Sequence, residues 1–268
     1  MKNRLSIVIG SGGVLCAASL GLSKALRRES LAPGMAVGCS GGSIYAAMIA
    51  LGMDPDEAQQ LTLNLFTSDV FEGYTSNLKS ALTGETRFNE TSSLIDDRIM
   101  YERLNRVFEE KTFDDTVFPL YIVATDLYTG ERVVITSGKI LDAIRASIAI
   151  PMIFSPWKIG DQLLVDGAVC DPLPIDVAIQ QGSDVIAAIG FEVPTRKRMN
   201  SYTAATRHFN SLYMNNILKS TFAFYNAVHH AEIIPILPSF EKPVGTFETQ
   251  QIPYIIAQGE KAAEEHIP

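Results

Sequence analysis

Short apolar runs alternate with segments of helical character along much of the chain. Such runs predict buried strands at Leu5–Ile9, Met35–Val37, Leu120–Ala124, Leu163–Val165 and Asp184–Ile189. Strands that alternate with helices are typical of an α/β fold, in which helices cover both faces of a mostly parallel sheet. The hydrophobic pattern therefore predicts that architecture.

Glycines mark several of the expected turns. Arg132–Thr136 is predicted to pair with Leu120–Ala124 across a turn at Thr129-Gly130. The segment Pro174–Gln181 has a helical pattern, and Gly182 follows it where a left-handed cap is expected. These signals place turns at the ends of regular elements.

Residues 54–110 interrupt the alternation and are richer in polar side chains. We expect a helical and irregular insertion there, of the kind that often forms a lid or a binding loop. Phe71 and Tyr74 are its candidates for contact with an apolar substrate. Residues 1–268 as a whole are predicted to form one domain that carries this insertion.

The last third of the chain has fewer distinctive signals. Tyr202–His230 carries aromatic residues at helical spacing, and we expect core packing to explain most of them and a minority to line an apolar substrate groove. The basic triplet Arg196-Lys197-Arg198 is interpreted as a solvated loop. The aromatic residues concerned are Phe209, Tyr213, Phe222, Phe224 and Tyr225.

Charge and composition exclude some classes of partner. Of the 268 residues 47% are hydrophobic, which predicts a well-filled core, and the formal net charge is −8. An acidic chain without a basic stripe is not expected to bind nucleic acid. Any contact with a membrane surface should therefore be transient, local and apolar. Three cysteines without metal-type spacing fit a reduced compartment.

The first 22 residues superficially resemble a signal peptide. However, Gly10-Ser11-Gly12-Gly13 breaks the apolar run where such a peptide should be continuous, so Leu5–Ile9 is interpreted as a first buried strand. No segment approaches the ~18 uninterrupted apolar residues of a spanning helix. We expect a soluble, cytoplasmic protein.

The pentapeptide Gly38-Cys39-Ser40-Gly41-Gly42 is the strongest chemical signal. A G-x-S-x-G sequence between a strand and a helix predicts a nucleophile elbow, where the turn presents a serine hydroxyl at the start of a helix. The helix dipole there favours developing negative charge. The alternative is a glycine-rich turn that only closes a strand–helix unit.

A second glycine-rich turn, Gly10-Ser11-Gly12-Gly13, follows the first predicted strand. Successive N–H groups in such a turn form a site for an anion, which suits an oxyanion hole. A plain turn and a nucleotide cradle are the alternatives. Neither G-x-G-x-x-G nor the P-loop pattern is complete, which disfavours nucleotide binding.

A nucleophilic serine also needs a base. Asp166 ends a buried strand and precedes Gly167, and the carboxyl ends of such strands are where sites assemble. An ordinary Asp-Gly turn is the alternative interpretation of this aspartate. The histidines, by contrast, lie in the carboxy-terminal quarter without a motif-like setting. They are His208, His229, His230 and His266.

Together these residues resemble the patatin-like phospholipase family. The shared pattern is the glycine-rich loop at 10–13, G-x-S-x-G at 38–42 and D-G-A at 166–168, in that order. Residues 124–127, the Thr129-Gly130 pair and residues 145–156 add to the similarity, which extends from Leu5 to Ile189. This combination is far more specific than any single motif.

The resemblance implies a three-layer α/β/α fold and a serine acyl hydrolase that acts on lipid or other acyl esters. Ser40 would be the nucleophile and Asp166 the proton acceptor. The N–H groups of Gly12 and Gly13, with Ser11 nearby, would hold the oxyanion. No metal or organic cofactor is required for such a mechanism, because fixed amides stabilise the charge.

The chain also departs from the family pattern. The position that is usually basic in the glycine-rich loop is Leu15, and the glycine after it is Cys16. The family often has an asparagine a few residues after the D-G-A segment, and in this chain Asp171 precedes Pro172 there. Two other functions therefore stay open, a catalytically silent lipid-binding module of the same fold and an esterase with a Ser-His-Asp triad.

Overall fold

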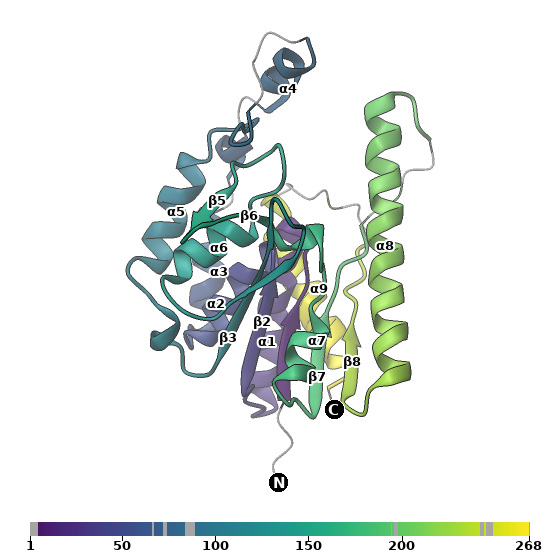
Figure 1. Cartoon of the computed structure of the whole chain (residues 1–268). Helices are drawn as coiled ribbons and strands as arrows, with labels where there is room; N and C mark the ends of the chain where they lie inside the picture. The colour runs from purple at the N-terminus through teal and green to yellow at the C-terminus, as the bar shows by residue number, and fades with distance from the viewer. Residues whose placement is uncertain are drawn as a thin grey trace.

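The computed structural model describes residues 5–65, 67–71, 74–83, 89–193, 195, 198–241, 244 and 249–267. Eight strands of this described part form one sheet, in the order β5-β6-β3-β2-β1-β7-β8, with β4 paired to β3 (Figure 1). The strands are β1 (Leu5–Ile9), β2 (Met35–Cys39), β3 (Leu120–Asp126), β4 (Arg132–Ile135), β5 (Trp157–Ile159), β6 (Gln162–Asp166), β7 (Val185–Ile189) and β8 (Glu232–Ile236).

The strand directions confirm the α/β prediction. The run β3-β2-β1-β7-β8 is parallel throughout, whereas β4 and β6 pair with β3, and β5 with β6, in the antiparallel sense. The interpretation of Leu5–Ile9 as a strand is confirmed, since β1 lies between β2 and β7. The predicted pairing across Thr129-Gly130 is also confirmed, because Thr125 lies opposite Arg132.

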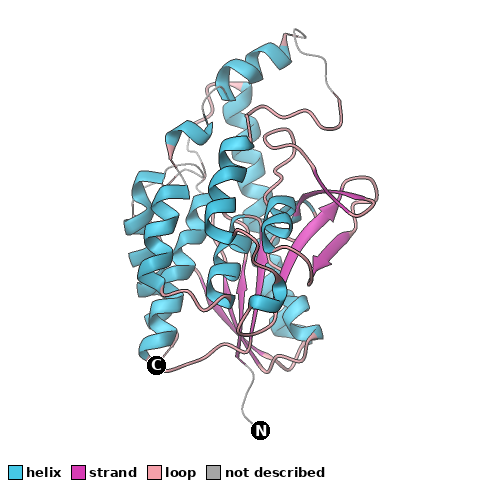
Figure 2. Ribbon diagram, turned by 90° about the vertical axis from the view of Figure 1, so that its left-hand side faces the viewer, coloured by secondary structure: helices cyan, strands magenta, loops and turns pink. Residues whose placement is uncertain are grey.

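Helices cover both faces of the sheet, which appears as a magenta layer between cyan helices in Figure 2. Ile7 and Ile9 of β1 face a large apolar cluster that includes residues of α1, α2 and α9, while Val8 faces a smaller cluster with α7 and α8. This alternation follows from the two-residue period of a strand. The helices are α1 (Ala18–Arg28), α2 (Gly41–Ala50), α3 (Pro55–Leu65), α4 (Tyr74–Leu82), α5 (Arg98–Phe108), α6 (Ile140–Ser147), α7 (Ile175–Gln180), α8 (Tyr202–Val228) and α9 (Ile252–Glu264).

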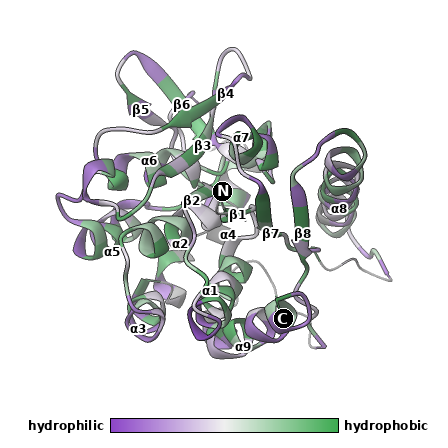
Figure 3. Cartoon of the chain, turned by 90° about the horizontal axis from the view of Figure 1, so that it is seen from below, coloured by the Kyte–Doolittle hydropathy of each residue, from purple (hydrophilic) through white to green (hydrophobic). Residues whose placement is uncertain are grey.

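Seen along the strands, α1, α2, α3, α5 and α9 lie on one side of the sheet, α7 lies on the other, and α8 stands beyond β8 (Figure 3). Within the described part of the chain, no helix combines the length and the apolar character that crossing a bilayer requires.

The register along β3 brings two distant parts of the chain together. Cys39 at the end of β2 pairs with Val123, and Asp166 at the end of β6 pairs with Ala124. Val123 and Ala124 also both pair with β4, so β2 and β6 must follow each other along the opposite edge of β3. The residue after β2 and the last residue of β6 therefore lie close together.

The insertion contains three helices in the described residues, α3, α4 and α5. The helical character expected for residues 54–110 is seen in these three helices. Arg196 and Lys197 lie outside the described residues, and so do the side chains of Phe71 and Tyr74.

The expectation that core packing explains most aromatic residues of α8 is wrong. Phe222 is buried, but Phe209, Tyr213 and Phe224 are at least half exposed. The helix lies at the edge of the sheet, where Leu218 and Phe222 pack onto it and the opposite side of the helix faces outward. The aromatic spacing did identify a helix, but not which of its faces is covered.

Candidate active site

Ser40 occupies a sharp turn between β2 and α2. Its φ is 53° and its ψ is −133°, a conformation that costs a residue with a side chain about 1–3 kcal/mol. The Ser40 carbonyl accepts hydrogen bonds from the N–H group of Ser43 at 2.9 Å and from the Ser43 hydroxyl at 2.6 Å. The first turn of α2 thus fixes the strained residue in place.

The glycines around Ser40 are required by close packing. A Cβ atom on Gly38 would lie 2.7 Å from Cβ of Ala46, and one on Gly42 would lie 2.5 Å from the Ile9 carbonyl oxygen. At Gly41 it would lie 2.6 Å from the carbonyl oxygen of Gly13, in the glycine-rich loop. These short distances show that the start of α2 lies close against the end of β1 and the glycine-rich loop. A residue larger than glycine does not fit at these positions.

The Ser40 hydroxyl donates a hydrogen bond of 2.6 Å to Oδ2 of Asp166. The other carboxylate oxygen, Oδ1, accepts from the backbone N–H group of Ala168 at 2.8 Å. Both side chains are buried, with exposed fractions of 6% for Ser40 and 3% for Asp166. The structure therefore brings together the two residues that the sequence analysis selected as nucleophile and base.

Burial raises the pKa of Asp166 to about 7, although the hydrogen bonds from Ser40 and from the Ala168 N–H group act in the opposite direction. A carboxyl group with this pKa exchanges its proton near neutral pH. This is the range in which a general base is effective.

The four residues of the glycine-rich loop have two different roles. The Gly10 N–H group donates to the Ile189 carbonyl at 3.0 Å, and the Ser11 N–H group donates to the Pro172 carbonyl at 2.8 Å. The N–H groups of Gly12 and Gly13 have no hydrogen-bond partner within the described residues. Gly10 and Ser11 thus anchor the loop, and the two amides that follow are available to a ligand.

Leu15 and Cys16, which differ from the family pattern, are both buried beneath this loop. Leu15 belongs to the large apolar cluster, and its exposed fraction is only 2%. Cys16 lies 3.3 Å from the Gly10 carbonyl oxygen, to which its thiol donates. Burial and the nearby charge of Asp166 raise the pKa of the Cys16 thiol, so it stays protonated. In this chain the loop rests on an apolar support.

Ser147 is part of the site, although the sequence analysis did not select it. Its hydroxyl accepts from the Ser40 N–H group at 2.8 Å and donates to the Val123 carbonyl at 2.6 Å. The only sequence signal is its place in the segment 145–156, which resembles the family. Its partners lie too far along the chain for their contact to be recognised.

None of the histidines takes the place of Asp166 as the hydrogen-bond partner of Ser40 in the described structure. His229 and His230 precede β8 and so lie at the amino end of the sheet, whereas Ser40 lies at its carboxyl end. His266 lines an apolar cavity of about 200 Å³ with Leu5 and Val185, also at the amino end. The His208 ring contacts Phe209 on α8.

The described side chains include no group of three or more histidine, cysteine, aspartate or glutamate residues suited to a metal ion. The polar groups of the site are a hydroxyl and a carboxyl group that bond to each other, and two backbone amides of the glycine-rich loop, which packs against the start of α2. A nucleophile, a base and donors for an oxyanion are the parts that acyl transfer needs.

Comparison with known proteins assigns the family. A sequence model described as patatin-like phospholipase matches residues 7–179. An uncharacterized NTE family protein of Mycobacterium tuberculosis is 31% identical over 174 residues, which cover 65% of this chain and 28% of that protein. Patatin-like phospholipase domain-containing protein 7 of Mus musculus is 27% identical over 190 residues, which cover 70% of this chain and 13% of that protein.

A second uncharacterized NTE family protein of M. tuberculosis is 27% identical over 227 residues, which cover 83% of this chain and 58% of that protein. The solved structure of VipD from Legionella pneumophila aligns with a TM-score of 0.47 and 12% identity over 99% of this chain and 67% of that one. The chain thus spans between 13% and 58% of the length of these three curated relatives, less than two thirds of each. Since the family model matches residues 7–179, which is more than half of the 268 residues, the chain belongs to the patatin-like phospholipase family.

Proposed function

We propose that this protein hydrolyses acyl esters of lipids, with Ser40 as the nucleophile and Asp166 as the general base. The observation that carries the proposal is the 2.6 Å hydrogen bond between a serine in a strained turn and a buried carboxyl group whose pKa is about 7. Membership of the patatin-like phospholipase family supports lipid esters as the substrate class.

In the first half of the reaction, Oγ of Ser40 attacks the ester carbonyl carbon while its proton passes to Oδ2 of Asp166. The carbonyl oxygen becomes an oxyanion, which the N–H groups of Gly12 and Gly13 stabilise. The bond to the leaving alcohol then breaks, and Asp166 returns its proton to the alcohol oxygen. An acyl ester of Ser40 remains.

The second half repeats these steps with water. Asp166 accepts a proton from a water molecule, whose oxygen attacks the acyl carbon of the Ser40 ester. When the tetrahedral intermediate collapses, Asp166 returns the proton to Oγ of Ser40 and the carboxylic acid departs. The same base serves both halves, so a pKa close to the working pH is an advantage.

Labelling with a fluorophosphonate tests the nucleophile. The reagent should modify the wild type at Ser40 and leave the Ser40→Ala variant unmodified, and that variant should not hydrolyse a p-nitrophenyl acyl ester. Asp166→Asn should be equally inactive. Asp126→Asn is a matched control, because Asp126 is also a buried aspartate at the end of a strand but binds the turn at 128–129.

Other outcomes would select the remaining alternatives. If one histidine-to-alanine variant is as inactive as Ser40→Ala, a triad replaces the Ser-Asp dyad. If the wild type binds lipid but is neither labelled nor active, the chain is a silent lipid-binding module. If catalytic efficiency does not rise from acetate to medium-chain p-nitrophenyl esters, an apolar acyl site is excluded, because each buried methylene should contribute up to ~0.8 kcal/mol.

A further inference from the structure

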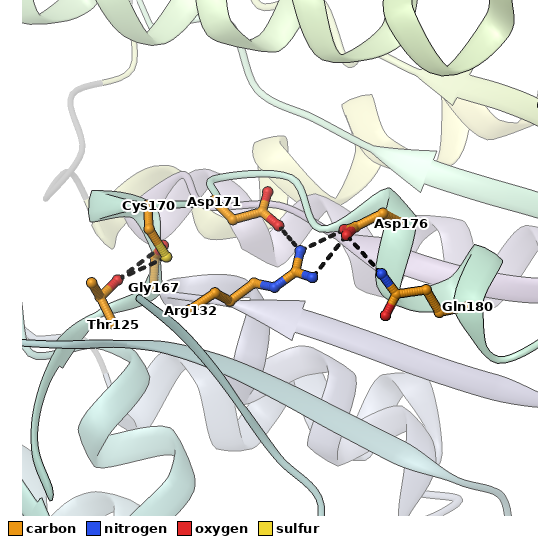
Figure 4. A network of polar contacts seen from close by, with 7 residues as sticks. All are labelled: Thr125, Arg132, Gly167, Cys170, Asp171, Asp176 and Gln180. Carbon is orange, nitrogen blue, oxygen red and sulfur yellow. Dashed lines mark hydrogen bonds and ion pairs between the residues drawn. The ribbon is translucent and has the colours of Figure 1, made fainter. Parts of the chain in front are cut away.

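Arg132 on β4 joins two acidic residues that follow the strand of Asp166 (Figure 4). Its Nη1 atom donates to Oδ2 of Asp171 and to Oδ1 of Asp176, both at 2.6 Å. Its Nη2 atom donates to Oδ2 of Asp176 at 2.7 Å. All three side chains are at least three-quarters buried, with exposed fractions between 20% and 25%. Water therefore screens these charges poorly.

The ion pair with Arg132 fixes the Asp171 side chain, and the backbone around Asp171 is also held in place. Its N–H group donates to the Gly167 carbonyl at 2.9 Å, and the nearby Leu173 N–H group acts to lower the pKa of its carboxyl group, which burial raises. The Pro172 peptide lies between these two anchored points. The orientation of the Pro172 carbonyl is therefore set by the position of the Asp171 side chain.

The Pro172 carbonyl is the group that holds the glycine-rich loop. It accepts the hydrogen bond from the Ser11 N–H group, and a Cβ atom on Gly10 would lie only 3.0 Å from its oxygen. The free amides of Gly12 and Gly13 come directly after Ser11. A shift of the Pro172 carbonyl would consequently move the donors intended for the oxyanion.

We propose that Arg132 and Asp171 are positioning residues that hold the glycine-rich loop at 10–13 in its position relative to Ser40. This inference rests on the proposed hydrolysis at Ser40. Without Arg132, the carboxylates of Asp171 and Asp176 would be left close together, partly buried and without a counter-charge, which favours displacement of the 171–173 backbone. Arg132 is thus the counter-charge that the two carboxylates share.

The test compares Arg132→Gln, Asp171→Asn and the double variant at a temperature where all are folded. Arg132→Gln should lower kcat at least about tenfold with KM nearly unchanged, because a small misplacement of donors is costly. Asp171→Asn should stay close to the wild type, since its amide oxygen can still accept the hydrogen bond from Arg132. The double variant should recover much of the lost kcat, because one of the two facing charges is gone.

Amide hydrogen exchange at Ser11 gives a readout that is independent of activity. We expect faster exchange at Ser11 in Arg132→Gln and a return toward the wild-type rate in the double variant. Arg28→Gln is the control, because Arg28 also joins two acidic residues, Glu260 and Glu264, but at the far end of α1. It should change neither Ser11 exchange nor kcat.

Unchanged Ser11 exchange and kcat in Arg132→Gln would overturn the inference, as would equal changes in Arg28→Gln. A double variant no better than Arg132→Gln would also contradict it. If the wild type hydrolyses no ester, the proposed function fails, but Ser11 exchange still decides whether Arg132 positions the loop.

Discussion

Ser147 holds the backbone of Ser40: the Ser147 hydroxyl accepts a hydrogen bond of 2.8 Å from the Ser40 N–H group. The same hydroxyl donates to the Val123 carbonyl, so it ties the strained turn to the neighbouring strand. The Ser40 amide is thereby occupied. In the proposed mechanism the oxyanion must find its donors elsewhere, and the free amides of Gly12 and Gly13 fit that role.

Ser147→Ala should weaken both the fold and the reaction. The substitution leaves the buried Ser40 N–H group and Val123 carbonyl without this partner, which should cost about 1–3 kcal/mol of unfolding free energy. Because the elbow then loses a restraint, kcat should also fall. Urea unfolding and ester kinetics measure the two effects.

Ser6→Ala is the matched control for that prediction. Ser6 is equally buried, and its hydroxyl forms a hydrogen bond of 2.5 Å with Ser183 near the start of β1, away from Ser40. It should lose stability and keep kcat. A Ser147→Ala variant with wild-type kcat would contradict a role in holding the elbow.

The pKa of Asp166 predicts how the rate depends on pH. Since the base must be ionised, kcat/KM should increase with pH through an apparent pKa near 7 and reach a plateau above it. A stopped assay with a substrate that does not titrate in this range measures the profile. A profile centred near pH 4 would show that the catalytic carboxyl group has an ordinary pKa.

The same group makes a prediction for stability. Between the unfolded pKa near 4 and the folded value of about 7, the folded protein holds a proton that the unfolded chain has released. Asp166 therefore makes the unfolding free energy fall as the pH rises through this window, by on the order of 4 kcal/mol.

Denaturant unfolding of the wild type and of Asp166→Asn from pH 4 to pH 8 isolates this effect. The variant should lose the part of the pH dependence that Asp166 contributes and be relatively more stable at pH 8. Parallel curves for the two proteins would refute the shift.

Gly12→Ala should displace the oxyanion loop. A Cβ atom at this position would lie 2.5 Å from Cδ2 of Phe191, a buried side chain that has little room to move. Loss of well-placed donors should lower kcat by roughly 10²–10³-fold. Gly34→Ala is the control, because the nearest atom to its Cβ would be 3.8 Å away. It should retain full activity.

Phe222 and Phe224 should differ sharply in their contribution to folding. Phe222 is buried against the sheet, and its truncation to alanine should cost about 3–5 kcal/mol. Phe224 is 58% exposed on the outer side of α8, so Phe224→Ala should change the unfolding free energy by only about 0.5 kcal/mol. Urea unfolding of both variants measures the difference, and equal losses would show that the outer side of α8 is covered in solution.

Much of the fold was predictable, because the buried strands of a parallel sheet appear in the sequence as continuous apolar runs. Leu5–Ile9 and Leu120–Ala124 show this pattern, and the structure has strands there. The strands β5 and β8 were not predicted. β5 has only three residues, and β8 contains Pro235, which sequence rules disfavour except on an edge strand.

The candidate site was predictable only where local sequence dictates geometry. Ser40 and the glycine-rich loop were visible because tight turns demand particular residues. The contacts of Ser147 and Arg132 were not, since each depends on partners that the fold brings close across 24 or more positions of the chain. The spacing of residues along the sequence does not predict contacts of this kind.

The end-to-end arrangement of β2 and β6 on β3 has a consequence for how this site can diversify. The separation of Ser40 and Asp166 is set by two neighbouring residues of one strand, Val123 and Ala124. The segment between α2 and β3, which carries α3, α4 and α5, has no residue in either of these two pairings. A change in the length of this segment therefore leaves both pairings on β3 intact, so in the proposed mechanism the surroundings of the site can vary while the spacing of nucleophile and base is kept.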